Sequence, residues 1–437
     1  MNSRALKGIA ALLFICLGSD VLAGYRTYLD PRSMSMGGAG VASSTKFNAS
    51  FHNPALIAFN RGDKPDKIYI HTSFGAREIY DHEFQDDVRA FQDSGVLEDF
   101  VETLRNSGPD EEAELRASAE RLKQALADIN LNGYRADEMT AFSLMVDTKP
   151  VTINFYTTRD IREMVTIRRQ DNERIDNFVD SRLSDTSRPI DDVSDEFRSS
   201  VDNTYYEIRE FGVTVATTNV IEYNMPISWG FTPKWIQING SHISDPLIDY
   251  DVSSPPDRRI STDLIEWNLD IGFALLMTDD FMEEVLGLDG YWLEGETVFG
   301  IVGKNLFPTD FTPWRPIRPD RRFPADKRAV QALYRIGVAH YREKYMMTMD
   351  LDLSENEVWD FEGLTRFLSV GTDYYWRDDF HIRAGLRFNL AQTSEAAKDK
   401  ATLTGGFLYQ PHGFSIEASA MINELEMGGT IGFGLAF

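Results

Sequence analysis

The chain has 437 residues, a formal net charge of −25 at pH 7 and a hydrophobic content of 42%. Such an excess of negative charge repels nucleic acid, so the composition argues against a DNA- or RNA-binding protein. Beyond the amino terminus, no segment approaches the run of about eighteen apolar residues that a transmembrane helix needs, which excludes a helical membrane protein. A β-barrel remains compatible with this composition, because only alternate residues of its strands face lipid.

Residues 1–23 have the pattern of a secretory signal peptide. Arg4 and Lys7 precede a short apolar stretch, and Ala23 supplies the small residue at which a leader peptidase cleaves. Cys16 is the only cysteine and leaves with this peptide, so we expect a mature chain without thiols, disulfides or thiolate metal sites. Residues 1–23 contain two basic and one acidic residue, so the mature net charge is −26.

Strands are predicted by alternation of apolar and polar residues. Over 380–390 one face is wholly apolar, while His381, Arg383 and Arg387 lie on the other face. This length suits a tilted strand that crosses a bilayer. The same reading predicts fourteen strands, at 67–79, 138–147, 151–166, 203–219, 226–239, 262–277, 296–305, 332–341, 345–354, 365–375, 380–390, 401–410, 413–422 and 428–437.

The connections between these strands alternate in length. The odd-numbered ones are long and the even-numbered ones are mostly short, with 278–295 as the exception. Outer-membrane barrels combine long external loops with short periplasmic turns, so both termini should be periplasmic.

Two of the long connections, at about 80–137 and 167–202, have helical spacing. In the first, Phe100, Val101 and Leu104 share one face. In the second, the two predicted faces are Ile175, Phe178 and Val179, and Val193, Phe197 and Val201. Both connections are rich in charged residues, so they are either solvated helical loops or a docking surface for a surface protein partner.

The carboxyl end is the most specific feature after the signal peptide. Phe433, Leu435 and the terminal Phe437 lie on one face of a predicted strand, and the residues between them, which lie on the other face, are small. This ending resembles the sorting signal that the barrel-assembly machinery recognises on outer-membrane proteins. Physically, it is an edge strand that can pair with an acceptor edge and close a barrel.

Short motifs along the chain resemble the FadL-like outer-membrane barrels, which include the PorV-like proteins. They are Arg32–Ala42, Asn53–Leu56, Gly300–Phe307, Asp350–Leu353 and Gly385–Asn389, and their order carries more weight than any one of them. Within this superfamily the chain looks most like the family labelled conjugal-transfer TraF-like. The thioredoxin-like proteins that share the TraF name use paired cysteines, so their disulfide chemistry is excluded here.

The resemblance implies a plug inside the barrel, formed by residues 24–66 ahead of the first strand. Carried over to this chain, Asn53, Pro54 and Ala55 would sit in the lumen. The small residues around Gly37, Gly38 and Gly40 suit close backbone packing. The alternative is an ordinary glycine-rich leader to the first strand.

Motifs of catalysis, dinucleotide binding and metal binding are absent, so we expect no enzyme activity, no cofactor and no metal site. Charged side chains of both signs are instead predicted on the inward strand faces: Asp270, Arg335, Asp350, Asp352, Asp373, His381, Arg383 and Arg387. They could line a polar passage, hold the plug or pair with one another, and pairing is favoured because unpaired buried charges are costly.

The predicted class is therefore an all-β protein, a transmembrane antiparallel barrel of about fourteen strands over 67–437, located in the outer membrane and in contact with its lipid. The leading hypothesis for function is a FadL-like channel that admits a small, hydrophobic ligand. A second is a non-transporting scaffold, PorV-like or related to conjugation, which binds a surface or periplasmic partner. A third, an outer-membrane enzyme, ranks last because no nucleophile or acid–base pair is visible.

Overall fold

A computed structural model describes residues 30–59, 68–80, 84–129, 133–148, 150–168, 171–184, 197–220, 225–247, 250, 264–277, 295–311, 328–357, 364–391 and 401–437. The predicted signal peptide, 1–23, lies outside these residues, as do the ends of the predicted plug segment.

Fourteen antiparallel strands form one closed barrel, which confirms the predicted fold class and strand number. In wall order the strands are β1 (Ile68–Tyr80), β2 (Tyr134–Thr148), β3 (Val151–Arg168), β4 (Ser200–Val220), β5 (Pro226–Pro246), β6 (Leu264–Met277), β7 (Glu296–Lys304), β10 (Leu333–Tyr341), β11 (Tyr345–Asp352), β14 (Phe367–Arg377), β15 (Phe380–Asn389), β16 (Thr402–Tyr409), β17 (Phe414–Ile422) and β18 (Glu426–Ala436). Two small sheets pair β8 (Thr309–Phe311) with β9 (Arg328–Val330), and β12 (Asn356–Glu357) with β13 (Leu364–Thr365).

The wall alternates between an exposed apolar face and a buried polar face, as the period of two requires. On β15, Ile382 and Leu386 point outward with exposed fractions of 41% and 39%, whereas Arg383 and Arg387 point inward and are buried. Most of the large exposed hydrophobic side chains elsewhere in the described chain also lie on outward strand faces.

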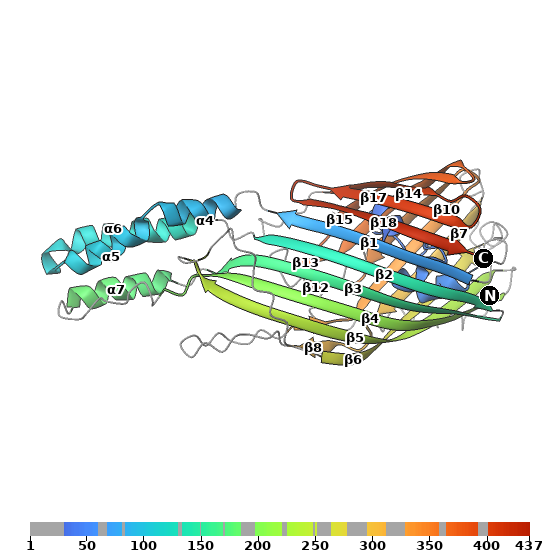
Figure 1. Cartoon of the computed structure of the whole chain (residues 1–437), viewed down its shortest axis with the longest axis horizontal. Coiled ribbons are helices and arrows are strands. Elements are labelled where there is room, and N and C mark those ends of the chain that lie inside the picture. Colours follow the sequence, from blue (N-terminus) through green and yellow to red (C-terminus); the bar gives the residue numbers. More distant parts are fainter. Residues whose placement is uncertain are drawn as a thin grey trace, which may run out of the picture.

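A helical extension projects beyond one end of the barrel, opposite the carboxyl terminus (Figure 1). It contains α4 (Phe84–Asp93), α5 (Val96–Asn106), η2 (Pro109–Glu111), α6 (Glu112–Asp128) and α7 (Asn172–Ser184). These helices share a core, which includes Phe100, Leu115 and Ile175, and they pack against Ile167 and Val201 on the ends of β3 and β4. No helix among the described residues is long and apolar enough to cross a membrane.

One helical expectation was wrong. Residues 197–199 form no helix and Val201 belongs to β4, so the second predicted face of the 167–202 connection is absent where the chain is described; Val193 lies outside the described residues. The helical periodicity there was overridden because the pairing of β4 with β5 extends as far as Ser200.

The segment ahead of β1 lies inside the barrel (Figure 1). It contains α2 (Pro31–Ser35), α3 (Ala49–His52) and η1 (Pro54–Ile57). In the following sections, "the plug" means residues 30–59. Almost all of its side chains are buried, because the inward strand faces surround it.

The barrel closes where β1 pairs with β18, in a register that runs from Tyr69 opposite Ala436 to Ile79 opposite Glu426. The terminal residue extends this ladder, because the Phe437 N–H donates to the Ile68 carbonyl over 3.0 Å. The last residue of the chain is therefore a rung of the closing seam.

Deleting Phe437 should lower the fraction of chains that close the barrel, because it removes the last rung and an apolar outward side chain. The folded fraction can be measured from the faster migration of unheated barrel in a detergent gel. Phe437→Leu keeps the backbone rung and should fold nearly as well as the parent. An unchanged folded fraction after the deletion would contradict this role.

Candidate functional site: the plug and the barrel lumen

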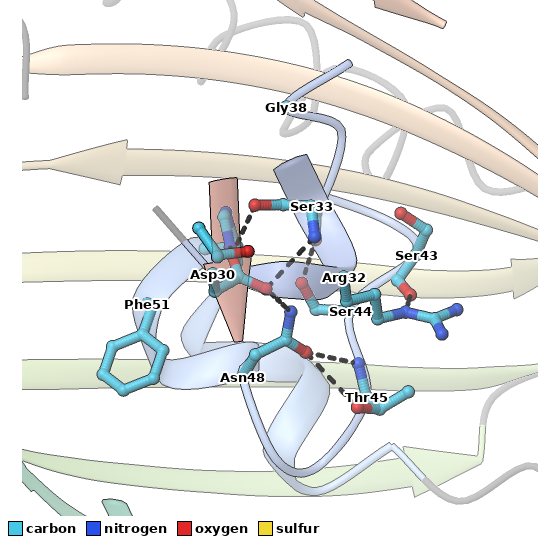
Figure 2. A network of polar contacts seen from close by, with 12 residues as sticks. Asp30, Arg32, Ser33, Gly38, Ser43, Ser44, Thr45, Asn48 and Phe51 are labelled. Atoms are coloured by element: carbon cyan, nitrogen blue, oxygen red, sulfur yellow. Dashed lines mark hydrogen bonds and ion pairs between the residues drawn. The ribbon is translucent and has the colours of Figure 1, made fainter. Parts of the chain in front are cut away.

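One buried carboxylate organises the plug. Asp30 caps α2 by accepting from the Ser33 N–H over 3.1 Å, and it also accepts from the Asn48 side-chain amide over 2.8 Å (Figure 2). His52 Nε2 lies 2.5 Å from the second oxygen of Asp30. The Asn48 side chain in turn accepts from the Thr45 N–H over 2.9 Å. Asp30 thus links the start of α2 to both ends of α3, and the plug is held together by its own polar network.

The charge of Asp30 is maintained by these contacts. Burial by itself would raise the pKa of this carboxyl, but the nearby His52 and the hydrogen bonds from His52 and Ser33 hold the pKa below its ordinary value. Asp30 therefore remains an anion inside the barrel.

The predicted plug glycines lie where the chain turns close to its neighbours. Gly37 and Gly38 have φ of 71° and 93°, a region that residues with side chains rarely adopt. A Cβ at Gly37 would lie 2.3 Å from the Leu386 carbonyl oxygen on the wall. A Cβ at Gly40 would lie 2.6 Å from the His52 ring. Gly37 and Gly40 therefore need glycine for space, and Gly37 and Gly38 need it for conformation.

The predicted Asn53–Ala55 stretch joins the plug to itself and to the wall. The Asn53 side-chain amide donates to the Val41 carbonyl over 2.8 Å and to the Phe273 carbonyl of β6 over 3.0 Å. Its oxygen accepts from the Ala55 N–H and caps η1. The Ala55 carbonyl accepts from Ser228 of β5 over 2.6 Å. Pro54 begins η1 and is buried.

The wall makes room for the plug with a girdle of inward-facing glycines. Three cross-strand pairs form part of it: Gly230 with Gly272, Gly300 with Gly337, and Gly371 with Gly385. A Cβ at any of these positions would lie within 3 Å of another atom, in most cases an atom of the plug. Plug backbone and strand backbone are therefore in direct contact, which only glycine permits.

Hydrogen bonds reach the plug from at least ten of the fourteen barrel strands. The partners on the wall, in strand order, are Ser143 and Asp147, Asn154, Thr218, Ser228, Phe273, Lys304, Arg335 and Tyr341, Asp350, Asp373, and Thr404. Hydrogen bonds to so much of the wall indicate that the plug is held in one position inside the barrel.

The inward charges predicted from the sequence form separate groups, each touching the plug or another charge. Asp350 accepts from two consecutive plug N–H groups, Gly40 over 2.7 Å and Val41 over 2.8 Å. Arg335 pairs with Asp352 over 2.7 Å and lies 3.7 Å from Asp350. This group on β10 and β11 therefore holds the turn after the plug glycines.

A second group lies on β14, β15 and β17. Asp373 pairs with Arg383 over 3.2 Å and with the plug residue Arg32 over 2.9 Å, and Arg383 also pairs with Glu417. His381 is partly exposed, and its Nδ1 lies 3.4 Å from Asp373. The buried charges of Arg32, Asp373, Arg383 and Glu417 thus alternate in sign from the plug to the wall.

The remaining predicted residues lie in two further places. Asp270 pairs with Lys234 over 2.9 Å, and Lys304 beside it donates to the plug carbonyl of Phe51 over 2.5 Å. Arg387 pairs with Glu426 over 2.7 Å, near the end of the barrel that carries the helices. The structure therefore does not gather the predicted charges into one site.

Sequence reasoning missed several partners of these charges: Arg32, Arg77, Arg135, Asp137, Arg162, Lys234, Lys304, Glu417 and Glu426. Inward parity within the predicted strands could have identified the wall members except Arg135, Asp137 and Glu426, which lie outside the predicted strand bounds and belong to β2 and β18 in the structure. Arg32 has no such signal, because its place depends on the fold of the plug. The residues that the structure describes contain no cluster of three or more metal-ligating side chains.

The closed barrel with an internal plug is a FadL-like fold. The TodX deltaS2S3 mutant monoaromatic hydrocarbon channel superposes with a TM-score of 0.51 at 12% identity, over 95% of this chain and 100% of that one. The CymD monoaromatic hydrocarbon channel and a Pseudomonas aeruginosa FadL homologue give TM-scores of 0.48 and 0.46 at 10% and 12% identity, each over 95% of this chain and 99% of theirs.

The sequence itself matches a family model over residues 50–282, and the chain belongs to this family, F plasmid transfer operon, TraF, protein. No curated protein matches the sequence.

The glycine girdle yields a direct test. In Gly385→Ala the new Cβ would lie 2.4 Å from the Met36 carbonyl carbon, so the plug must shift and the barrel should lose about 1–3 kcal/mol of stability. Gly405→Ala, on the next strand but facing outward, meets its nearest atom at 3.6 Å and serves as the matched control. Thermal unfolding followed by gel migration should separate the two variants. Equal unfolding temperatures would show that the plug does not press on Gly385.

Proposed function

We propose that this chain is an outer-membrane channel that admits a small, hydrophobic solute through the barrel, with the plug as its gate. The observation that carries this proposal is an apolar cluster on the inward faces of β3, β4 and β5. It contains Met164, Tyr206, Ile208, Ile236 and Ile238, and Val330 of β9 packs against these wall residues. The interior of a transmembrane barrel is ordinarily polar, so inward apolar side chains need a reason. Contact with an apolar solute supplies one.

The position of the cluster fits a path from outside. Residues 206, 208, 236 and 238 lie nearer the helix-bearing end of their strands than Ser228 and Thr218, which hold the plug. If the long connections are external, a solute entering there meets the apolar cluster before it meets the plug. The fold is shared with a monoaromatic hydrocarbon channel, which makes a small aromatic compound the first solute to test.

An outer-membrane location is supported by the outer surface of the barrel. Outward-facing aromatic side chains on neighbouring strands contact one another, with ring centroids 5.6 Å apart for Phe211 and Trp235 and 4.0 Å apart for Trp235 and Trp267. An apolar outer face with aromatic side chains is the surface that a bilayer requires of a barrel.

The scaffold alternative receives less support. A surface partner held by apolar contact would need an exposed apolar patch on the helical extension. Among the helix residues whose side chains are described, none is a large hydrophobic residue with an exposed side chain, because Phe100, Leu115 and Ile175 are used in the shared core. A conjugation-related role, which the family description suggests, would have to use the charged surface of these helices.

Deleting residues 37–58 should open the barrel without unfolding it, because the strand ladder closes on itself and does not include the plug. Single-channel conductance in planar bilayers should rise. Asp350→Ala, which removes the acceptor of the Gly40 and Val41 N–H groups and the carboxylate beside Arg335, should give a smaller rise. A correctly inserted deletion protein with unchanged conductance would show that wall side chains seal the lumen, and the gating proposal would fail.

The apolar cluster can be tested with the double variant Ile236→Ser, Ile238→Ser. Uptake of toluene into proteoliposomes should slow by roughly fivefold or more, since each lost apolar contact is worth on the order of 1 kcal/mol. Ile265→Ser changes a similar side chain on the outer face, where its exposed fraction is 61%, and should leave uptake unchanged. Equal uptake by all folded variants would remove the cluster from the solute path.

A further inference from the structure

The seam between β1 and β18 changes in character along its length. Toward the carboxyl terminus its outward face carries apolar cross-strand pairs. Phe74 lies opposite Ile431 there, and Ile70 lies opposite Leu435. Such side-chain pairs stabilise neighbouring strands beyond the main-chain ladder. This part of the seam is therefore held by side chains as well as by backbone hydrogen bonds.

Small residues occupy the part of the same seam that lies nearer the helix-bearing end of the barrel. On the outward face Ala76 lies opposite Gly429, and on the inward face Arg77 lies opposite Gly428. The outer surface is hollowed at this level, in a groove lined by Ala76 and Gly429 and by small residues of β16 and β17. Glycine has no side chain to pair across the seam, so this part needs another contact to add to its backbone ladder.

Arg77 supplies such a contact. Only 3% of its side chain is exposed, and it donates from Nε to Asp137 of β2 over 3.0 Å and from Nη1 to Glu426 of β18 over 2.9 Å. Gly428 keeps the way clear, since a Cβ there would lie 3.2 Å from the Cβ of Arg77. One guanidinium therefore connects the first strand of the barrel with the last strand and with the second.

Both carboxylates are fixed by further partners on their own side of the seam. Glu426 accepts from Arg387 of β15 over 2.7 Å. Asp137 accepts from Arg162 of β3 over 3.1 Å. Charge-assisted bonds of this kind to a planar guanidinium are among the stronger hydrogen bonds in proteins. Each carboxylate is thus held by its own half of the wall, and Arg77 connects the two halves.

We infer that Arg77 and Glu426 form a latch that keeps the helix-bearing end of the seam closed. Removal of one member of a buried ion pair leaves an uncompensated charge, which is strongly unfavourable. Loss of either side chain should therefore let β1 and β18 separate locally at this end, while the apolar pairs hold the rest of the seam. The latch belongs to the barrel wall and does not depend on whether a solute is transported.

Hydrogen exchange of the backbone amides measures the latch directly. In Glu426→Gln, the amides of residues 76–79 and 427–429 should exchange at least about ten times faster than in the parent, because local opening exposes them to water. Amides near Ile70 and Leu435 should keep their parental rates. The rates can be followed by mass spectrometry on the folded barrel in detergent micelles.

Glu417→Gln is the matched control. Glu417 has the same exposed fraction as Glu426, 5%, and it also pairs with an arginine, Arg383 of β15. Both members of this second pair lie on the same side of the seam, so its loss should leave exchange at residues 427–429 unchanged. Equal exchange at these residues in the two variants would overturn the latch.

A disulfide across the seam provides a second measurement, which also covers a Glu426→Gln variant that fails to fold. In a Cys16→Ala background, Ala76→Cys and Gly429→Cys place the only two thiols at directly opposite positions. The Cα atoms of such antiparallel pairs are about 4.5–5.5 Å apart, which suits a disulfide. Oxidation should return Glu426→Gln to parental exchange or restore its folding, and reduction should reverse this. A disulfide that forms and restores neither would show that Glu426 acts elsewhere than at the seam.

Discussion

Closure of the strand ladder is the constraint on which the rest of this structure depends. A barrel leaves no strand edge unpaired only when its first and last strands meet, and here β1 and β18 pair along almost their whole length. Closure turns one face of every strand inward. Polar side chains on that face lose access to bulk water, so they must find partners inside the barrel.

The plug supplies many of those hydrogen-bond and ion-pair partners, and the wall in turn supplies partners for the polar groups of the plug. Asp350 would be a buried carboxylate beside Arg335 alone without the N–H groups of Gly40 and Val41. Arg32 would be a buried cation without Asp373. The glycine girdle adds a steric match, since backbone contact at Gly371 and Gly385 leaves no room for side chains. Plug and wall are therefore complementary in both charge and shape, so movement of the plug would require several contacts to exchange together.

The interior differs in character along the barrel axis. Ion pairs and backbone contacts surround the plug, whereas apolar side chains of β3, β4 and β5 line the wall toward the helical extension. The helical extension has a core of its own and covers the outer face of the strand ends, so its charged surface remains in water.

The sequence by itself determined the strands, since period two places Ile382 and Arg383 on opposite faces whatever the barrel encloses. It also determined where close backbone packing is possible, because Gly37, Gly38 and Gly40 have no side chains to keep neighbouring atoms apart. It could not determine which inward charges meet. Arg32 and Asp373 are 341 residues apart in the chain, and only closure of the wall around the folded plug brings them to 2.9 Å. The same closure brings Arg77 to Glu426 across the seam, because partners on different elements are chosen by tertiary packing and leave no periodic signal in the chain.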